Sequence, residues 1–135
     1  MDYLLIGERI LAAIQALFGL KGSLETAKRE QRERMVALFE KVAECLDSAA
    51  SELRRGNYPG GRCQELLTYA VELPAVVKGV LEEGKAKEIG DALRDAHEVE
   101  RLFAVRGTPE GEADIGRLDE AAGLLRALGN LLRAR

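Results

Sequence analysis

Cysteine is scarce in this chain, and its scarcity excludes two common ways of holding a small protein together. The sequence has 2 cysteines in 135 residues, Cys45 and Cys63, and neither belongs to a paired CxxC motif of the kind that binds zinc. If they lie on antiparallel helices that turn between Gly56 and Gly61, they are roughly 15 Å apart, beyond the roughly 7 Å limit for a disulfide. We therefore expect two small, buried hydrophobic side chains in a reducing, cytoplasmic setting.

An excess of positive charge is also absent. Lysine and arginine number 20 and aspartate and glutamate 23, which gives a formal net charge of -3. Binding to a phosphate backbone needs clustered cations in excess, so we expect no nucleic-acid partner. Proline is rare and hydrophobic residues make up 47% of the chain. This composition is typical of a folded globular domain and not of a disordered segment.

The first residues lack the pattern of a secretory signal peptide. Asp2 stands where a basic segment belongs, and no small-x-small cleavage site follows Leu17 and Phe18. We therefore expect no targeting segment there. A chain of this length is sufficient for one hydrophobic core without disulfides or metal.

Catalytic and ligand-binding motifs are missing as well. The string from Gly79 to Ala86 has the glycine and lysine spacing of a phosphate-binding loop, but Ala86 replaces the Ser or Thr that would hold magnesium. Glu82 and Glu83 would repel a phosphate there. His97 is the only histidine, and it lacks both metal-motif spacing and a nucleophile to activate. We therefore expect no enzyme activity, no cofactor, no metal site and no small-molecule substrate.

Glycine and proline divide the chain into segments whose apolar residues recur at helical spacing. Four of these segments are predicted to be helices, at residues 3–18, 24–53, 62–81 and 85–103, with an interruption at Pro74. The turns between them are too short for crossover connections. The pattern predicts an all-α fold, an antiparallel four-helix bundle with an additional C-terminal helix.

The C-terminal part of the chain is predicted to be an additional helix beyond the bundle domain. Residues 1–105 form the helical bundle domain, and residues 114–135 form a helix that packs on the bundle or on another chain. Residues 106–113 have the composition of a linker, or of a weak helix start with Thr108 as cap and Pro109 following. Gly116, Gly123 and Gly129 each cost about 1 kcal/mol relative to alanine in a helix interior. The segment therefore needs a packing partner.

The first predicted helix is strongly apolar. Its hydrophobic side chains cover more than half of the helical circumference, and Glu8, Arg9 and Gln15 share the remaining arc. Such a helix is either buried at the centre of a protein or suited to lipid. Residues 3–20 would reach about 27 Å, slightly less than a hydrocarbon layer of about 30 Å, and Glu8 and Arg9 would oppose insertion. Both interpretations hold if the helix is packed at rest and inserted after release.

Three strings in the sequence resemble a known family. They are DYLLIGERI at residues 2–10, ELRRGNYP at residues 52–59 and the pair Leu73 and Pro74. With the long second helix, they make residues 1–105 similar to the bacterial Bell domains, which are similar in plan to fungal HeLo-like domains and to the four-helix bundle of the necroptosis effector MLKL. The resemblance implies a regulated cell-death effector of bacterial immunity, which rests in the cytoplasm and permeabilises the cell membrane from its inner face when clustered.

The resemblance also implies which residues act. The membrane-active element would be the first helix, and Glu8 and Arg9 would set the threshold for its insertion. Its apolar residues are Tyr3, Leu4, Leu5, Ile6, Ile10, Leu11, Ile14, Leu17 and Phe18. Its partners would be membrane lipid on activation and either copies of itself or a signalling protein. The sequence departs from the family where residues 114–135 show a helical pattern, because family members typically carry a short amyloid-forming or adaptor motif there.

A helical adaptor without membrane activity is the alternative. It would be similar in plan to death-fold or effector-associated domains and would recruit a partner protein. The packing of the first helix separates the two interpretations. A fully enclosed face of Ile10, Ile14 and Leu17 with no basic surface nearby favours the adaptor, whereas a loosely packed or exposed first helix favours the membrane effector.

Overall fold

The computed structural model describes residues 6–134, except for the side chains of residues 62, 63, 95–97 and 100, and every regular element in this range is a helix. The elements are α1 (Ile6–Gly19), α2 (Lys21–Leu24), α3 (Arg29–Arg54), α4 (Gly60–Val76), α5 (Glu83–Arg94), the 3₁₀ helix η2 (Asp95–Val105) and α6 (Pro109–Arg133). The predicted all-α class is confirmed.

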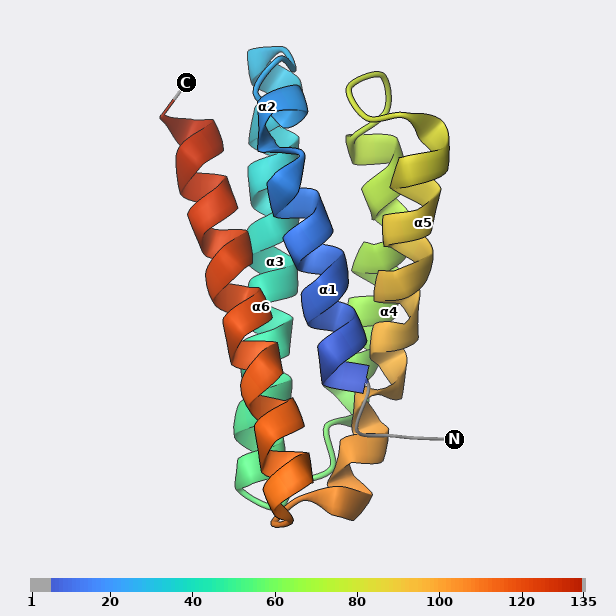
Figure 1. Cartoon of the computed structure of the whole chain (residues 1–135), viewed down its shortest axis with the longest axis vertical. Coiled ribbons are helices and arrows are strands. Elements are labelled where there is room, and N and C mark those ends of the chain that lie inside the picture. Colours follow the sequence, from blue (N-terminus) through green and yellow to red (C-terminus); the bar gives the residue numbers. More distant parts are fainter. Residues whose placement is uncertain (1–5, 135) are drawn as a thin grey trace.

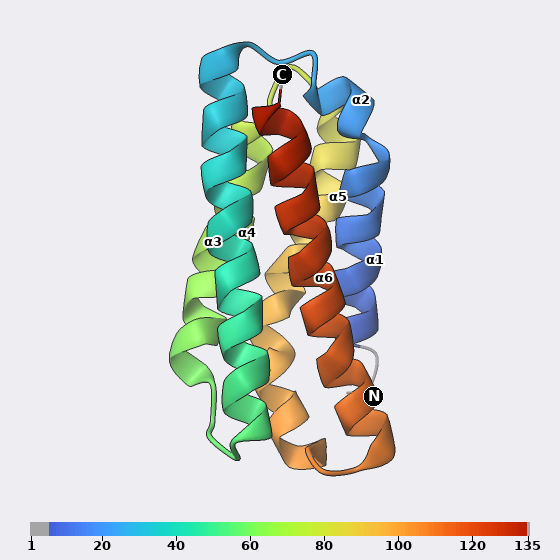
Figure 2. The same ribbon diagram turned by 90° about the vertical axis from the view of Figure 1, so that its left-hand side faces the viewer.

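Within residues 6–134, five rods of helix run side by side along the long axis of the molecule (Figure 1). Their contacts form a closed ring around one hydrophobic core. α3 contacts α6 on one side and α4 on the other, and α4 contacts the continuous rod of α5 and η2. That rod contacts α1, and α1 contacts α6, which closes the ring (Figure 2). This arrangement differs from the expected four-helix bundle with an additional helix, because α6 lies between α1 and α3 as a full member of the ring.

An odd number of rods leaves one neighbouring pair parallel. α1 and α6 run in the same direction, whereas each of the other neighbouring pairs is antiparallel (Figure 1, Figure 2). The parallel pair has the positive N-terminal ends of two helix dipoles towards the same end of the bundle. A negative charge between these two ends is therefore stabilising.

α3 and α6 are joined along their length by three ion pairs, which lie seven residues apart on each helix. The pairs are Glu40 with Arg133, Asp47 with Arg126, and Arg54 with Asp119. The N–O distance is 2.5 Å between Arg126 and Asp47 and 2.6 Å between Arg54 and Asp119. These three pairs, the α3–α6 ladder, link α6 to α3 along most of its length. Of the two predicted partners for this helix, the bundle or another chain, the structure shows the bundle.

An interruption of the helix was predicted at Pro74, and the structure does not show one. α4 continues through Pro74 to Val76, and the segment that follows is a turn in which Gly79 has a φ of +86°. A Cβ built on Gly90 of α5 would lie 3.3 Å from Cγ of Pro74. The close approach of α5 to the proline ring supplies packing that offsets the backbone hydrogen bond that proline cannot make.

The helix predicted at residues 85–103 divides into α5 and the 3₁₀ helix η2. Val99 and Leu102 are fully buried and Val105 is half-buried. Their spacing of three residues places them on one face of a helix with three residues per turn. The apolar spacing in this segment therefore favours the tighter winding.

Of the two predictions for residues 106–113, a linker or a helix start capped by Thr108, the structure shows the helix start. The helix begins at Pro109, where Thr108 is the N-cap and its hydroxyl accepts a hydrogen bond from the Gly111 amide at 3.0 Å. The Glu112 carboxylate accepts from the Gly107 amide, also at 3.0 Å. Proline at the first helical position and a threonine cap are strong signals for a helix start. Because of them, α6 begins at Pro109, before the residue 114 at which the predicted C-terminal helix begins.

Candidate functional site

α1 is a rod of the ring with one buried face and one exposed face, and it does not lie at the centre of the bundle. Its buried residues are Ile6, Gly7, Ile10, Leu11, Ala13, Ile14 and Leu17. Glu8, Arg9, Ala12, Gln15 and Ala16 are exposed. Phe18 is half-buried, with the Lys21 ammonium 4.9 Å from its ring centroid. Tyr3, Leu4 and Leu5 lie outside the described residues.

The apolar face of α1 is fully enclosed. Ile10 is 1% exposed, and Ile14 and Leu17 are 0% exposed. α6 covers this face from one side, and α5 with η2 covers it from the other. In the described part of the chain, no helix combines the length and the apolar character that crossing a membrane requires. α1 itself has 14 residues, which corresponds to about 21 Å.

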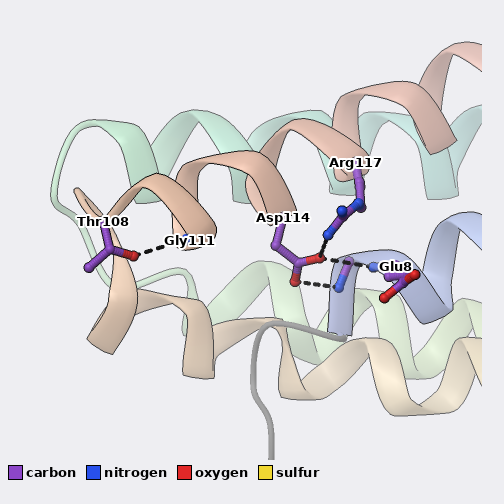
Figure 3. A network of polar contacts seen from close by, with 6 residues as sticks. Glu8, Thr108, Gly111, Asp114 and Arg117 are labelled. Carbon is purple, nitrogen blue, oxygen red and sulfur yellow. Dashed lines mark hydrogen bonds and ion pairs between the residues drawn. The ribbon is translucent and has the colours of Figure 1, made fainter.

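Among the residues that the structure describes, Asp114 of α6 is the only charged residue that is buried, and its exposure is 0%. Its carboxylate holds the N-terminus of α1 (Figure 3). The amide of Gly7 donates to Oδ2 at 2.8 Å, and the amide of Glu8 donates to Oδ1 at 3.0 Å. The first amides of a helix have no partner within that helix, so Asp114 caps α1 from a neighbouring helix.

Arg117 completes this arrangement, one turn further along α6. Its Nη1 donates to Oδ1 of Asp114 at 2.9 Å. That hydrogen bond raises the pKa of the Arg117 guanidinium. We call Gly7, Glu8, Asp114 and Arg117 the Asp114 cluster. Its carboxylate lies at the N-terminus of α1, where a negative charge offsets the dipole of that helix.

Gly7 allows α1 to approach Asp114 this closely. A Cβ built at residue 7 would lie 2.3 Å from the carbonyl oxygen of Asp114 and 2.8 Å from its Oδ1. Real Cβ atoms do not approach oxygen at such distances, so any larger residue requires α1 and α6 to separate. The glycine is therefore a steric requirement of the Asp114 cluster.

Glu8 and Arg9, the predicted threshold charges, lie on the exposed face of α1. The Arg9 guanidinium is 3.8 Å from the Glu98 carboxylate of η2, which is also 3.6 Å from Arg101. Glu88 of α5 also lies beside α1, in a shallow hollow that Arg9 and Ala16 line, and it pairs with Lys85 at 3.6 Å. Both signs of charge are interspersed there, so this side of the described surface is not a basic patch.

The other sequence candidates are dispersed. Cys45 is buried, as predicted, and its thiol donates to Oε2 of Glu65 at 3.1 Å. The side chains of Cys63 and His97 lie outside the described set. Among the side chains that are described, no three His, Cys, Asp or Glu residues gather closely enough to hold a metal ion.

Comparison with protein-family models, curated proteins and solved structures finds no match.

Sequence reasoning missed Asp114, Arg117 and the role of Gly7. A signal for Asp114 was present, because it precedes the buried residues Ala121 and Leu128 by one and two steps of seven. An acidic residue at a position with the core spacing of its helix indicates a specific buried partner. The partner could not be identified from the sequence, because it is a pair of backbone amides, and almost every residue has a backbone amide.

Proposed function

We propose that this domain is a membrane-permeabilising effector of regulated cell death, at rest in the cytoplasm, that acts through α1 at the inner face of the cell membrane when several copies cluster. The resemblance of residues 2–10 and 52–59 to the bacterial Bell domains supports this proposal. In this proposal, the bundle with the apolar face of α1 covered is the resting state.

The position of α1 in the ring is the observation that carries the proposal. α3 contacts α6 and α4, α4 contacts α5 and η2, and η2 contacts α6. These contacts do not involve α1. Removal of α1 would therefore leave the other four rods in contact with one another, which is what a releasable helix requires.

The energy of release explains why clustering is needed. Full burial of a large aliphatic side chain contributes about 1.5–3 kcal/mol. The five that α1 buries therefore contribute together roughly 7–15 kcal/mol, a range similar to the total stability of a small domain. They are Ile6, Ile10, Leu11, Ile14 and Leu17. In a lone copy, α1 therefore stays packed on the bundle. In clustered copies at a membrane, lipid can bury the same apolar side chains, and this can shift the equilibrium from packed to released α1.

The length of α1 defines how it meets the membrane. A helix of 14 residues reaches about 21 Å, short of the hydrocarbon layer of about 30 Å. Its exposed face carries Glu8, Arg9 and Gln15. A short helix with one apolar and one polar face lies in the plane of the interface, with the apolar face in lipid. The proposed action is insertion along the surface, and permeabilisation follows from several such helices in one area.

A helical adaptor is the second candidate, and two observations favour it. The face of Ile10, Ile14 and Leu17 is enclosed, and the surface beside α1 has both signs of charge. In this case α1 is a permanent part of the core. The domain would then bind its partner protein through the outer surface of the ring without touching lipid.

A dye-release assay on phospholipid vesicles separates the two candidates. The chain is tested free and fused to an oligomerising domain, and Phe18→Glu is compared with Ala16→Glu. Phe18 is half-buried at the edge of the apolar face, and Ala16 is exposed, so neither glutamate has to enter the core.

The clustered parent and Ala16→Glu should release dye, the free chain should not, and clustered Phe18→Glu should release it at least about tenfold more slowly, because a charge opposes insertion. Absence of release from the clustered parent would refute the membrane role and favour the adaptor. Equal release from the two glutamate variants would refute insertion through the apolar face of α1.

A further inference from the structure

We infer that the Asp114 cluster is a latch that controls the opening of α1 as a unit separate from the rest of the bundle. This inference rests on the proposed release of α1 and names its control point. It differs from the sequence-based expectation, in which the exposed residues Glu8 and Arg9 set the threshold. The buried carboxylate lies on α6 and stays with the bundle when α1 leaves.

The first step of the inference is the type of contact. Ile10, Ile14 and Leu17 pack against apolar side chains, and apolar contacts weaken gradually as two surfaces slide or separate. The hydrogen bonds from the Gly7 and Glu8 amides to Asp114 have fixed directions and distances of 2.8 and 3.0 Å. They are lost completely after a small displacement. The N-terminus of α1 is therefore either held or free.

The second step is the cost of the half-open state. If the amides of Gly7 and Glu8 withdraw, Asp114 retains the hydrogen bond from Arg117 in a site that is 0% exposed. A buried carboxylate that loses partners is strongly unfavourable until water reaches it. Water reaches it only when α1 moves away. Opening at the N-terminus therefore favours release of the whole helix.

The third step is that α1 can open alone. α1 packs on α6, α5 and η2, whereas α4 packs on α3, α5 and η2 from the other side of the ring. Local opening of one element is common where its contacts do not support the others. A weakened latch should therefore expose α1 while α4 stays protected.

Two substitutions weaken the latch by different means, and each has a matched control. Asp114→Asn keeps the shape but replaces a charged acceptor with an amide that has one acceptor oxygen. Its control is Asp119→Asn on the same helix, which breaks only the exposed ion pair with Arg54. Gly7→Ala places a Cβ 2.3 Å from the Asp114 carbonyl oxygen, and its control is Gly19→Ala on α1, where a Cβ has no neighbour within 4 Å.

The readout is amide hydrogen exchange of the full chain without membrane or oligomeriser. Peptides from residues 10–19 report on α1, and peptides from residues 64–76 report on α4. Asp114→Asn and Gly7→Ala should each accelerate exchange in α1 by about tenfold or more, because charge-assisted hydrogen bonds are lost. Exchange in α4 should change by less than about twofold, and neither control should accelerate exchange in α1.

Two results would overturn the inference. Equal acceleration of α1 and α4 would mean that Asp114 stabilises the whole domain and that α1 does not open alone. Unchanged α1 exchange in both latch variants would mean that the cluster does not limit opening. Because the readout needs no lipid, a failed dye-release assay would refute the membrane proposal and leave this result intact.

Discussion

Replacing both Gly116 and Gly123 of α6 with alanine is expected to stabilise the domain by about 2 kcal/mol. Both glycines lie within α6, and a Cβ built at either position has no neighbour within 4 Å. Glycine in a helix interior costs about 1 kcal/mol relative to alanine, because its unfolded backbone has more freedom to lose. The positions are about 10.5 Å apart along the helix, so the two gains should add.

Gly111→Ala is the matched control, with the same substitution on the same helix and the opposite expected sign. A Cβ at residue 111 would lie 2.0 Å from the carbonyl oxygen of Val105. The obstacle is backbone, so no side-chain rotation relieves it. The turn that begins α6 must shift, and we expect a loss of at least about 2 kcal/mol.

Urea and thermal unfolding followed by circular dichroism measure both changes. The double alanine variant should unfold at higher urea with an unchanged m-value, and its Tm should rise by about 6–10 °C. Gly111→Ala should unfold at lower urea. A double variant less stable than the parent would refute the reasoning. If the Tm of the parent also depended on protein concentration, the chain would self-associate, and a second copy packed against Gly116 and Gly123 would explain why alanine destabilises there.

Two further predictions concern charges. Lys87→Ala should raise the pKa of Asp91, which the hydrogen bond from Lys87 holds below its ordinary value, and carboxyl NMR titration measures this. In the parent, this pairing stabilises the fold above about pH 4 and is lost as the pH falls through the lowered pKa. Arg126→Glu should destabilise the domain by about 0.5–1 kcal/mol by facing Asp47, and adding Asp47→Arg should restore most of the loss in urea unfolding.

The helices were predictable because their signals are local. Apolar spacing identified the segments of α1, α3, α4 and α5, and glycine and proline identified the turns between them. Pro74 was misjudged because its effect depends on a contact with Gly90, which is distant in sequence. The tighter winding of η2 was missed although the three-residue spacing of Val99 and Leu102 is visible in the sequence.

The arrangement of the helices depends on contacts between distant segments. The α3–α6 ladder pairs residues 65 positions apart in one case and 93 in another. Its sequence signal is a charged residue at every seventh position of both helices, which is recognisable only after the two segments are compared. The Asp114 cluster is harder to predict, because a carboxylate that binds backbone amides 106 and 107 positions away has no complementary side chain to find.

The α3–α6 ladder has a reversed third pair, because α3 supplies the acid in the first two pairs and the base in the third. A slide of α6 by one heptad would place Asp47 opposite Asp119, or Arg54 opposite Arg126. A parallel alignment of the two helices would place Glu40 opposite Asp119 and Arg54 opposite Arg133. Each alternative juxtaposes like charges, which is unfavourable. The sign pattern therefore encodes both the orientation and the register of α6, and so fixes the height at which Asp114 meets α1.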